Sequence, residues 1–455
     1  MPTGSRQGRL VFLVVAVALF MVSVDMTIVA TALPAIHRGL HASINWAGWT
    51  ITIYGLFQVI ALPIAGKFSS QFGRKRVFLC GIALFTAASL LCGFSSDIYL
   101  LIVFRAIQAL GGGALQPSAA GLIADHFGKN RDRGIGMFGA VSSGGQVVGP
   151  IFGGLLVEGL SWRWIFFVNV PVGIALVFMA LRYLPESERT EGERTDLSGL
   201  LLMSSAVLAA IYGITSLGEG RTRIYDPIFL VPVLAAVVLL TLFARHTRRA
   251  ASPFIPVRLL VGKGFALMNW VNFLHGMVTF GIVSLVPLYA EQRYHIAALG
   301  SGTLLTARAV GMILVGTVAA LALRRTGYRM PMMVGFTLIA IGNLLMSVSP
   351  RWGVSPYLWL SCSVGITGLG LGAVNPAASN ACLHLAPDQA AAVTGLRVMF
   401  INIGVIFSVS VTTAILNRSA APAMTQAHVF WVAAAIVVLI MLPLVSRVPE
   451  HKGGW

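Results

Sequence analysis

The chain reads GKFSSQFGRKR at residues 66–76 and RRTGYR at residues 324–329. In both stretches a turn glycine stands among basic residues, and in both the basic turn separates two long apolar stretches. The recurrence of this arrangement in the two halves of the chain indicates a parallel internal repeat. Each half is expected to carry such a turn between its second and third helices.

Charge-poor stretches of about 20 residues, the length that a helix needs to cross a bilayer, recur along the chain. Fourteen are expected, at residues 10–36, 44–66, 77–96, 98–124, 134–157, 164–181, 197–218, 227–244, 264–290, 296–323, 330–349, 354–383, 390–417 and 429–446. The predicted fold class is an all-α polytopic membrane protein. Two six-helix bundles are expected over 1–185 and 264–455, the second with a short cytoplasmic tail, and linkers with two additional transmembrane helices over 186–263.

Two of these spans have alternatives. The apolar run from Leu10 to Val24 follows two arginines, as in a secretory signal peptide, but the many spans that follow favour a first membrane helix. Stretches 197–218 and 227–244 could instead form one re-entrant hairpin. Both are long and uncharged, which favours two spans.

The composition excludes several classes of protein. The 455 residues are 57% hydrophobic and only 10% charged, whereas soluble proteins have about 25% charged residues. A soluble globule of this composition would have too few polar residues to cover its surface. The shortage of charge also argues against disorder, and the glycines follow no collagen period. The four cysteines lie in apolar stretches and indicate neither a disulfide framework nor a metal site.

The net charge of +17 is explained by orientation in the membrane. With a cytoplasmic amino terminus, 22 of the 32 basic residues lie in inner segments, 7 in outer loops and 3 within spans. This bias follows the positive-inside rule, so no nucleic-acid partner is needed. Both termini are expected in the cytoplasm. The seven outer residues are Arg38, Arg163, Arg221, Arg223, Arg293, Arg351 and Arg418.

Several motifs resemble the major facilitator superfamily, and within it the fourteen-span drug:proton antiporter branch. They are VDMTIVATALP at 24–34, the basic turn at 66–76, RAIQ at 105–108 with Gly111, GQVVGPIFGG at 145–154, and WRWIFFVNVP at 162–171. The resemblance covers the whole chain. It implies the major facilitator fold, a multi-pass protein of the bacterial inner membrane, and efflux driven by protons without a cofactor.

Asp25 interrupts an otherwise uncharged span, where an ionised carboxylate costs several kcal/mol unless it is paired or protonated. The other 14 of the 15 acidic residues lie in loops or near helix ends, so Asp25 is the best candidate for a reversible proton site. Arg105 lies at a similar depth, since the two residues are about 16 Å and about 12 Å from the outer ends of their spans. Protonation of Asp25 would release Arg105 and couple the proton to movement. The alternative is a static buried pair.

Three further glycines, Gly145, Gly149 and Gly153, recur every four residues and form one smooth helix face that allows close approach of another helix. Pro150 removes a helical hydrogen bond and is expected to bend this helix. The resemblance implies that this motif, which ends at Gly154, forms a leak-resistant contact between the two bundles. Ordinary small-residue packing is the alternative.

In the basic turn, Gly66 and Gly73 belong to the family pattern, and Arg74 and Lys75 anchor the turn on the cytoplasmic face. The chain departs from the pattern at Ser70, where the family usually has Asp, and at Gln71, where it usually has Arg. Without that carboxylate a charge-based latch between the halves is in doubt, and Arg397 lacks its obvious acidic partner.

Three arginines against one acid make the predicted membrane interior positive, because Arg308 and Arg397 join Arg105. This argues against a doubly cationic substrate and favours a neutral, amphipathic or anionic one. Bonds from Arg308 and Arg397 to backbone carbonyls are the alternative. The remaining cavity candidates are polar groups in apolar spans, each of which alone is more often an interhelical hydrogen bond: Tyr54, Gln58, Gln108, Gln146, Asn272, His275, Asn375 and Asn402. His275 is also a candidate second proton carrier.

The favoured function is proton-coupled export of small amphipathic compounds or drugs by alternating access, with substrate bound between the bundles. Export of an endogenous metabolite or lipid is the second reading, and a transporter-like sensor is the third. An enzyme would need a cluster of nucleophilic or acid–base residues, or a phosphate-binding loop, and the sequence has neither. The expected partners are a small molecule, protons and the bilayer, with a monomeric transport unit and no metal.

Overall fold

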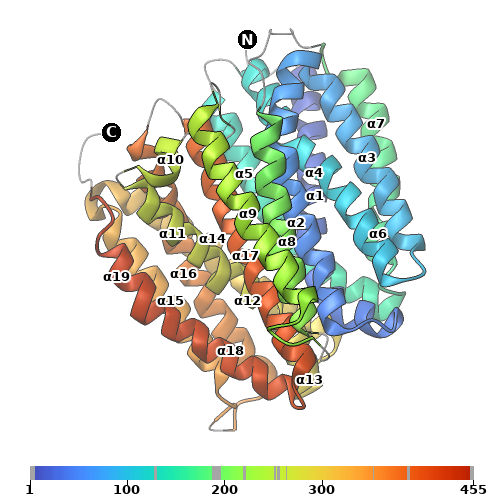
Figure 1. The fold of residues 1–455 in the computed structure, drawn as a ribbon. Coiled ribbons are helices and arrows are strands. Elements are labelled where there is room, and N and C mark those ends of the chain that lie inside the picture. The colour runs from blue at the N-terminus through green and yellow to red at the C-terminus, as the bar shows by residue number, and fades with distance from the viewer. Residues whose placement is uncertain are drawn as a thin grey trace. The chain divides into compact units, whose positions relative to one another are not determined.

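A computed structural model describes residues 6–127, 131–186, 196–218, 222–250, 253, 257–262, 264–351, 353–386 and 390–450. Regular structure within these ranges is helical throughout (Figure 1). The chain divides into two compact units, each described by itself below. Unit 1 contains residues 1–42 and 49–195, and unit 2 contains residues 43–48 and 196–455.

The helices of unit 1 are long because apolar residues run through them with few interruptions. They are α1 (Arg6–Gly39), α2 (Ile44–Phe72, which begins in residues assigned to unit 2), α3 (Arg74–Phe94), α4 (Ile98–Phe127), α5 (Arg131–Gly159), α6 (Trp164–Phe167) and α7 (Asn169–Tyr183). Helix α1 packs against α5, α4 and α7, and α3 packs against α4 and α7.

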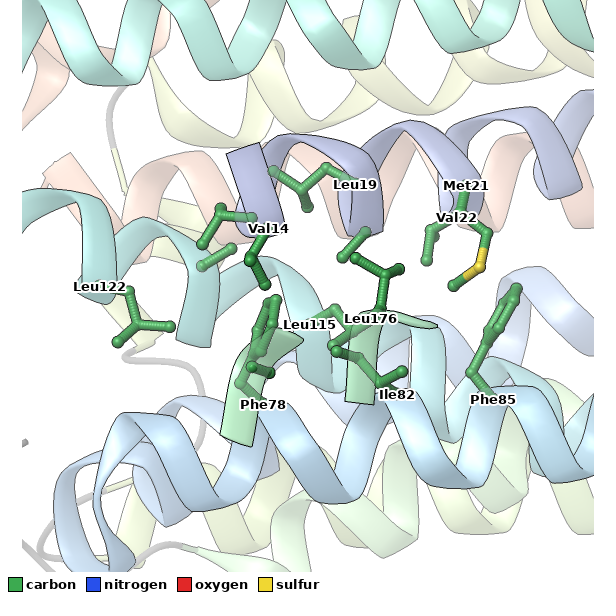
Figure 2. Close-up of a cluster of buried hydrophobic side chains, with 14 of the residues drawn as sticks. Val14, Leu19, Met21, Val22, Phe78, Ile82, Phe85, Leu115, Leu122 and Leu176 are labelled. Atoms are coloured by element: carbon green, nitrogen blue, oxygen red, sulfur yellow. The ribbon is translucent and has the colours of Figure 1, made fainter. Parts of the chain in front are cut away.

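A cluster of buried apolar side chains joins α1, α3, α4 and α7 (Figure 2). Val14 and Val22 of α1 meet Phe78 and Ile82 of α3 across this cluster, and Leu176 comes from α7. All five side chains are at most 1% exposed. Because the four helices share one core, polar residues that they carry one or two turns away are held in fixed relative positions.

Unit 2 contains the remaining helices. They are α8 (Leu197–Gly218), α9 (Pro227–Arg249), α10 (Val257–Val261), α11 (Phe265–His275), η2 (Gly276–Gly281), α12 (Ile282–Ser284), α13 (Val286–Tyr294), α14 (Ala298–Thr326), α15 (Arg329–Ser347), α16 (Pro356–Leu385), α17 (Ala390–Arg418), α18 (Pro422–Ile436), η4 (Val437–Met441) and α19 (Leu442–Val445). Helix α16 packs against α14 and α15, and α17 packs against α11, η2 and α8. The predicted central pair is α8 and α9, which lie side by side (Figure 1).

The all-helical membrane fold predicted from the sequence is confirmed, while the number of spans is not settled. Twelve segments of the described residues are long and apolar enough to cross a membrane, and they match twelve of the fourteen predicted spans. The other two predicted spans, 44–66 and 134–157, form α2 and α5, each a helix of 29 residues. The count of fourteen therefore stays a prediction.

Two predicted boundaries differ from those of the structure, and one predicted span keeps its bounds but contains a turn residue. The basic turn expected over 66–76 is helical up to Phe72, and Gly73 alone, with a φ of 94°, separates α2 from α3. The sixth predicted span, 164–181, matches the candidate span Trp164–Tyr183, in which the single residue Val168 separates α6 from α7 and keeps α-helical φ and ψ. The ninth predicted span, expected over 264–290, contains the π-helical turn η2 and ends at Ser284, because Leu285 interrupts the helix directly before α13, which begins at Val286 and has Pro287 in its first turn.

Candidate functional site

The carboxylate of Asp25 lies at the centre of a buried polar cluster in unit 1. Arg105 Nη1 donates to Asp25 Oδ2 at 2.6 Å. Gln108 Nε2 and Asn169 Nδ2 donate to Asp25 Oδ1 at 3.0 and 3.1 Å. All four side chains are at most 3% exposed. The carboxylate thus accepts three side-chain hydrogen bonds in a site closed to solvent, and one of the donors carries a full positive charge.

A second layer of contacts holds these donors in place. Arg105 Nη1 also donates to Gln108 Oε1 at 2.6 Å, and Arg105 Nε donates to the Thr50 carbonyl at 3.2 Å. The guanidinium carbon lies 4.0 Å from the centre of the Tyr54 ring. Gln108 Nε2 donates to Ser89 Oγ at 2.7 Å. Because Gln108 contacts both Asp25 and Arg105, a change in the charge of either residue alters the hydrogen bonds of the same amide group.

The helices explain why these residues meet. Arg105 and Gln108 stand three residues apart on α4 and therefore project from the same face. Asn169 is the first residue of α7, and its side-chain amide donates to Asp25.

Asn169 is the member of the cluster that sequence reasoning missed. It belongs to the quoted stretch 162–171, but it was not selected as a site residue. A usable signal was present, because an asparagine within an apolar span needs a buried partner. Gln108 was selected only as a loose cavity candidate, and the structure places it in the Asp25 cluster instead.

The cluster has two chemically distinct states. With Asp25 ionised, the carboxylate and the Arg105 guanidinium compensate each other's charge in a buried site. A proton on Asp25 would remove the negative charge and turn one acceptor oxygen into a donor. Arg105 would then keep only neutral partners, the Thr50 carbonyl, the Gln108 amide and the Tyr54 ring, so protonation would change which arrangement is favourable.

The glycine face of α5 lies against α1 within unit 1. A Cβ atom built at Gly145 would lie 2.9 Å from the Phe20 carbonyl oxygen, and one at Gly149 would lie 2.9 Å from that of Val24. One at Gly153 would lie 2.9 Å from Ile28 Cγ1. The close approach expected for these glycines is therefore made to the helix that carries Asp25. The resemblance had implied a contact between the bundles, whereas the neighbour that explains the glycines belongs to the same unit.

The structure places the rest of this motif on the same helix. Pro150 and Gly154 lie within α5 and are buried. The helix is continuous through Pro150, and the bend expected there stays a prediction. Gln146 is half-buried on α5 and does not belong to the hydrogen-bonded cluster around Asp25 described above.

The basic turn makes specific contacts within unit 1. Arg74 Nη1 donates to the Gly121 carbonyl on α4 at 3.1 Å. Lys75 Nζ lies 3.4 Å from Glu186 Oε1, in a pair whose carboxylate side chain is 73% exposed. Gly66 lies inside α2, not in a turn. The turn thus ties the cytoplasmic ends predicted for α3 and α4 together.

The cavity candidates of unit 1 divide into two groups. Tyr54 packs its ring on Arg105 and so belongs to the Asp25 cluster. Gln58 donates to the Met26 sulfur at 3.6 Å on α1, next to Asp25 in sequence. Both side chains are 2% exposed, so in this conformation they line no open space.

Unit 2 holds a separate group of candidates. Arg397 Nη2 on α17 donates to Asn375 Oδ1 on α16 at 3.1 Å, and His275 Nε2 lies 3.3 Å from the same oxygen. The Arg308 guanidinium carbon lies 4.7 Å from the centre of the Phe280 ring. The other two candidates are Asn272, which donates to the Cys382 sulfur at 3.4 Å, and Asn402, which is half-buried on α17.

Comparison with known proteins agrees with this architecture. The family model of the Major Facilitator Superfamily matches residues 15–299 and 268–454. The chain is 30% identical over 413 residues to the multidrug transporter protein MdtP of Bacillus subtilis, across 90% of this chain and 75% of that protein. It is 32% identical over 409 residues to the tetracenomycin C resistance and export protein of Streptomyces glaucescens, across 87% and 73%.

A solved structure shares the fold at low sequence identity. The crystal structure of peptide transporter POT in complex with sulfate has a TM-score of 0.70 and 16% identity, and the match covers 99% of this chain and 98% of that chain. At this identity the likeness concerns the fold alone. Together with the family match and the helical membrane architecture, it leads to one conclusion: the chain belongs to the Major Facilitator Superfamily and is a multi-pass membrane transporter, not an enzyme.

Proposed function

We propose that the chain is a proton-coupled efflux transporter of the fourteen-span drug:proton antiporter branch, which exports small amphipathic compounds or drugs by alternating access. The names of its relatives, a multidrug transporter protein and a resistance and export protein, support the substrate class. The proposal also includes cytoplasmic termini and the bacterial inner membrane, because the basic residues concentrate in alternate loops.

The observation that carries the proposal is the Asp25 carboxylate. Among the candidate spans formed by the described residues, Asp25 is the one acidic side chain. It accepts hydrogen bonds from three side chains, one of them the Arg105 guanidinium at 2.6 Å. An ionisable residue at such depth is expensive to keep and is functional by default.

In the proposed cycle the proton and the arginine compete for Asp25. Proton binding leaves the buried charge of Arg105 uncompensated, which disfavours the packing of α4 against α1 seen here. Deprotonation restores the ion pair and this packing. The difference in free energy between the two states of the pair would bias the transporter between its two facing conformations.

The test is transport in proteoliposomes with an imposed pH gradient, in which the intact chain is compared with Asp25→Asn. Asparagine has nearly the size of aspartate but binds no proton, so gradient-driven uphill transport of a drug is expected to fall at least about tenfold. Downhill exchange of the same drug without a gradient should persist, since it needs no proton. Asp97→Asn, in the loop before α4, is the matched control and should transport normally. Full gradient-driven transport by Asp25→Asn would refute the proposed role.

A further inference from the structure

The spans of unit 2 carry positive charge that no acid in those spans balances. Arg308 and Arg397 lie within the candidate spans 298–316 and 396–418. The eight candidate spans that the described residues form in unit 2 contain no aspartate or glutamate. In unit 1, by contrast, Arg105 is paired with Asp25 at 2.6 Å. The excess positive charge inferred from the sequence is therefore concentrated in unit 2.

Each of the two arginines has guanidinium nitrogens that lack an acceptor. In Arg308, Nε and Nη2 are buried and have no hydrogen-bond partner among the described residues, and the same holds for Nε of Arg397. Arg397 makes one hydrogen bond, to the neutral amide of Asn375. A buried charged donor without an acceptor costs more free energy than a neutral one. These three nitrogens thus form a set of donors that an anionic acceptor would satisfy.

A continuous chain of contacts connects the two arginines across four helices and η2. Arg308 on α14 stacks over the Phe280 ring in η2, and Phe280 meets His275 with the ring centres 5.5 Å apart. His275 and Arg397 then share Asn375 Oδ1 on α16. The two cations therefore flank one aromatic and amide surface.

Parts of this surface are open. Arg308, Phe280, Asn375 and Arg397 are partly exposed, while His275 between them is fully buried. A charged guanidinium at mid-span is expensive unless water or an acceptor reaches it, so the unpaired nitrogens of Arg308 and Arg397 favour a polar ligand at this place. A partly exposed aromatic ring next to a cationic group suits a ligand that carries both an anionic group and a flat apolar body.

We propose that unit 2 contains a binding site for aromatic organic anions, in which Arg308 and Arg397 bind a carboxylate or sulfonate and Phe280 contacts the ring. This inference rests on the proposed function, since it names the substrate class of the exporter. It restricts the proposed substrates from amphipathic compounds in general to amphipathic compounds with one negative charge. The planar fork of arginine suits a carboxylate better than a lysine would.

The test is equilibrium binding of a matched set of ligands to the full chain in phosphatidylcholine nanodiscs, with empty nanodiscs subtracted. The set is 9-anthracenecarboxylate, its neutral amide and the cationic 9-(aminomethyl)anthracene, which share one ring system. The carboxylate is expected to bind at least about tenfold more tightly than the amide. Arg308→Gln and Arg397→Gln should each remove most of this preference and leave the affinity for the amide within about twofold.

Controls separate a binding role from a structural one. Arg351→Gln removes an exposed arginine between α15 and α16 and should leave the preference intact. The neutral amide reports whether a variant is folded, since a misfolded protein would lose both ligands. Nanodiscs that also contain phosphatidylglycerol distinguish the source of the anion. Displacement of the carboxylate by this lipid would support the site and assign it to an anionic headgroup, whereas no displacement would support a soluble anion.

Equal affinities for carboxylate and amide, or a preference unchanged in both arginine variants, would overturn the proposal. Binding is measured without a pH gradient, so it requires no proton-driven transport through Asp25. If Asp25→Asn lost the anion preference, the two sites would not be independent and the assignment to unit 2 would also be wrong. Proton-driven transport and anion binding can therefore fail separately.

Discussion

Replacement of Gly149 by alanine tests the contact between α5 and the helix that carries Asp25. A Cβ atom at this position would lie 2.9 Å from the Val24 carbonyl oxygen and would overlap Oγ1 of Thr27. The Thr27 hydroxyl can rotate, but the Val24 oxygen belongs to the helix backbone. Ordinary contact begins at 3.4 Å, so α1 and α5 would have to separate by about 0.5 Å.

The expected cost is the overpacking penalty minus the gain in helix propensity. Extra atoms in a well-packed core cost about 1–3 kcal/mol, and alanine gains about 1 kcal/mol over glycine in a helix. Gly149→Ala should therefore lower the free energy of unfolding by up to about 2 kcal/mol. Since Val24 precedes Asp25, the same displacement should lengthen the 2.6 Å ion pair with Arg105 and reduce proton-driven transport as well.

Gly144 gives a matched control on the same helix. A Cβ atom there would meet nothing within 4 Å among the described residues, so Gly144→Ala should be neutral or stabilising by up to about 1 kcal/mol. Two quantities are measured for each variant. The melting temperature in detergent micelles is read from circular dichroism, and gradient-driven transport is measured in proteoliposomes. Equal melting temperatures for the two variants would refute the tight packing described for α1 and α5.

Three further predictions concern stability in the same melting assay. Asn169→Leu should lower the free energy of unfolding by about 1.5–3 kcal/mol, because a hydrogen bond to the charged Asp25 is lost. Asn343→Leu should raise the free energy of unfolding, since both polar atoms of that buried amide lack partners among the described residues. Gly73→Ala should cost about 1–3 kcal/mol, because its φ of 94° disfavours a side chain. Lys75→Ala should cost less than about 1 kcal/mol, less still in high salt, because Glu186 is 73% exposed.

The sequence was sufficient for the parts of the fold that depend on long apolar runs. Twelve predicted spans coincide with membrane-length helices, because about 20 apolar residues leave few alternatives to a helix in a bilayer. The proximity of Asp25 and Arg105 was also accessible, since two charges at similar depth in apolar helices need each other. Their contact at 2.6 Å agrees with that expectation.

Details that depend on single backbone conformations were not accessible. Residues between Gly66 and Phe72 are compatible with a turn and with a helix, and only the geometry of Gly73 decides where α2 ends. Nothing in the sequence around Asn169 identifies its partner on another helix, so its hydrogen bond to Asp25 was missed. A polar residue in an apolar span indicates that a hydrogen-bond partner exists, but the sequence does not identify that partner.

The π-helical turn η2 has a consequence for insertions and deletions. In an α-helix, residues five apart point to different sides, because one turn takes 3.6 residues. Across η2 the bond from Ile282 N to the Met277 carbonyl spans five residues, and the His275 and Phe280 rings lie together. Loss of one codon within 276–279 would restore α-helical spacing and rotate one half of the helix by about 100° against the other. The contact between the Phe280 ring and the Arg308 guanidinium thus depends on the number of residues in this segment. A one-residue deletion there would separate the two groups although both side chains are retained.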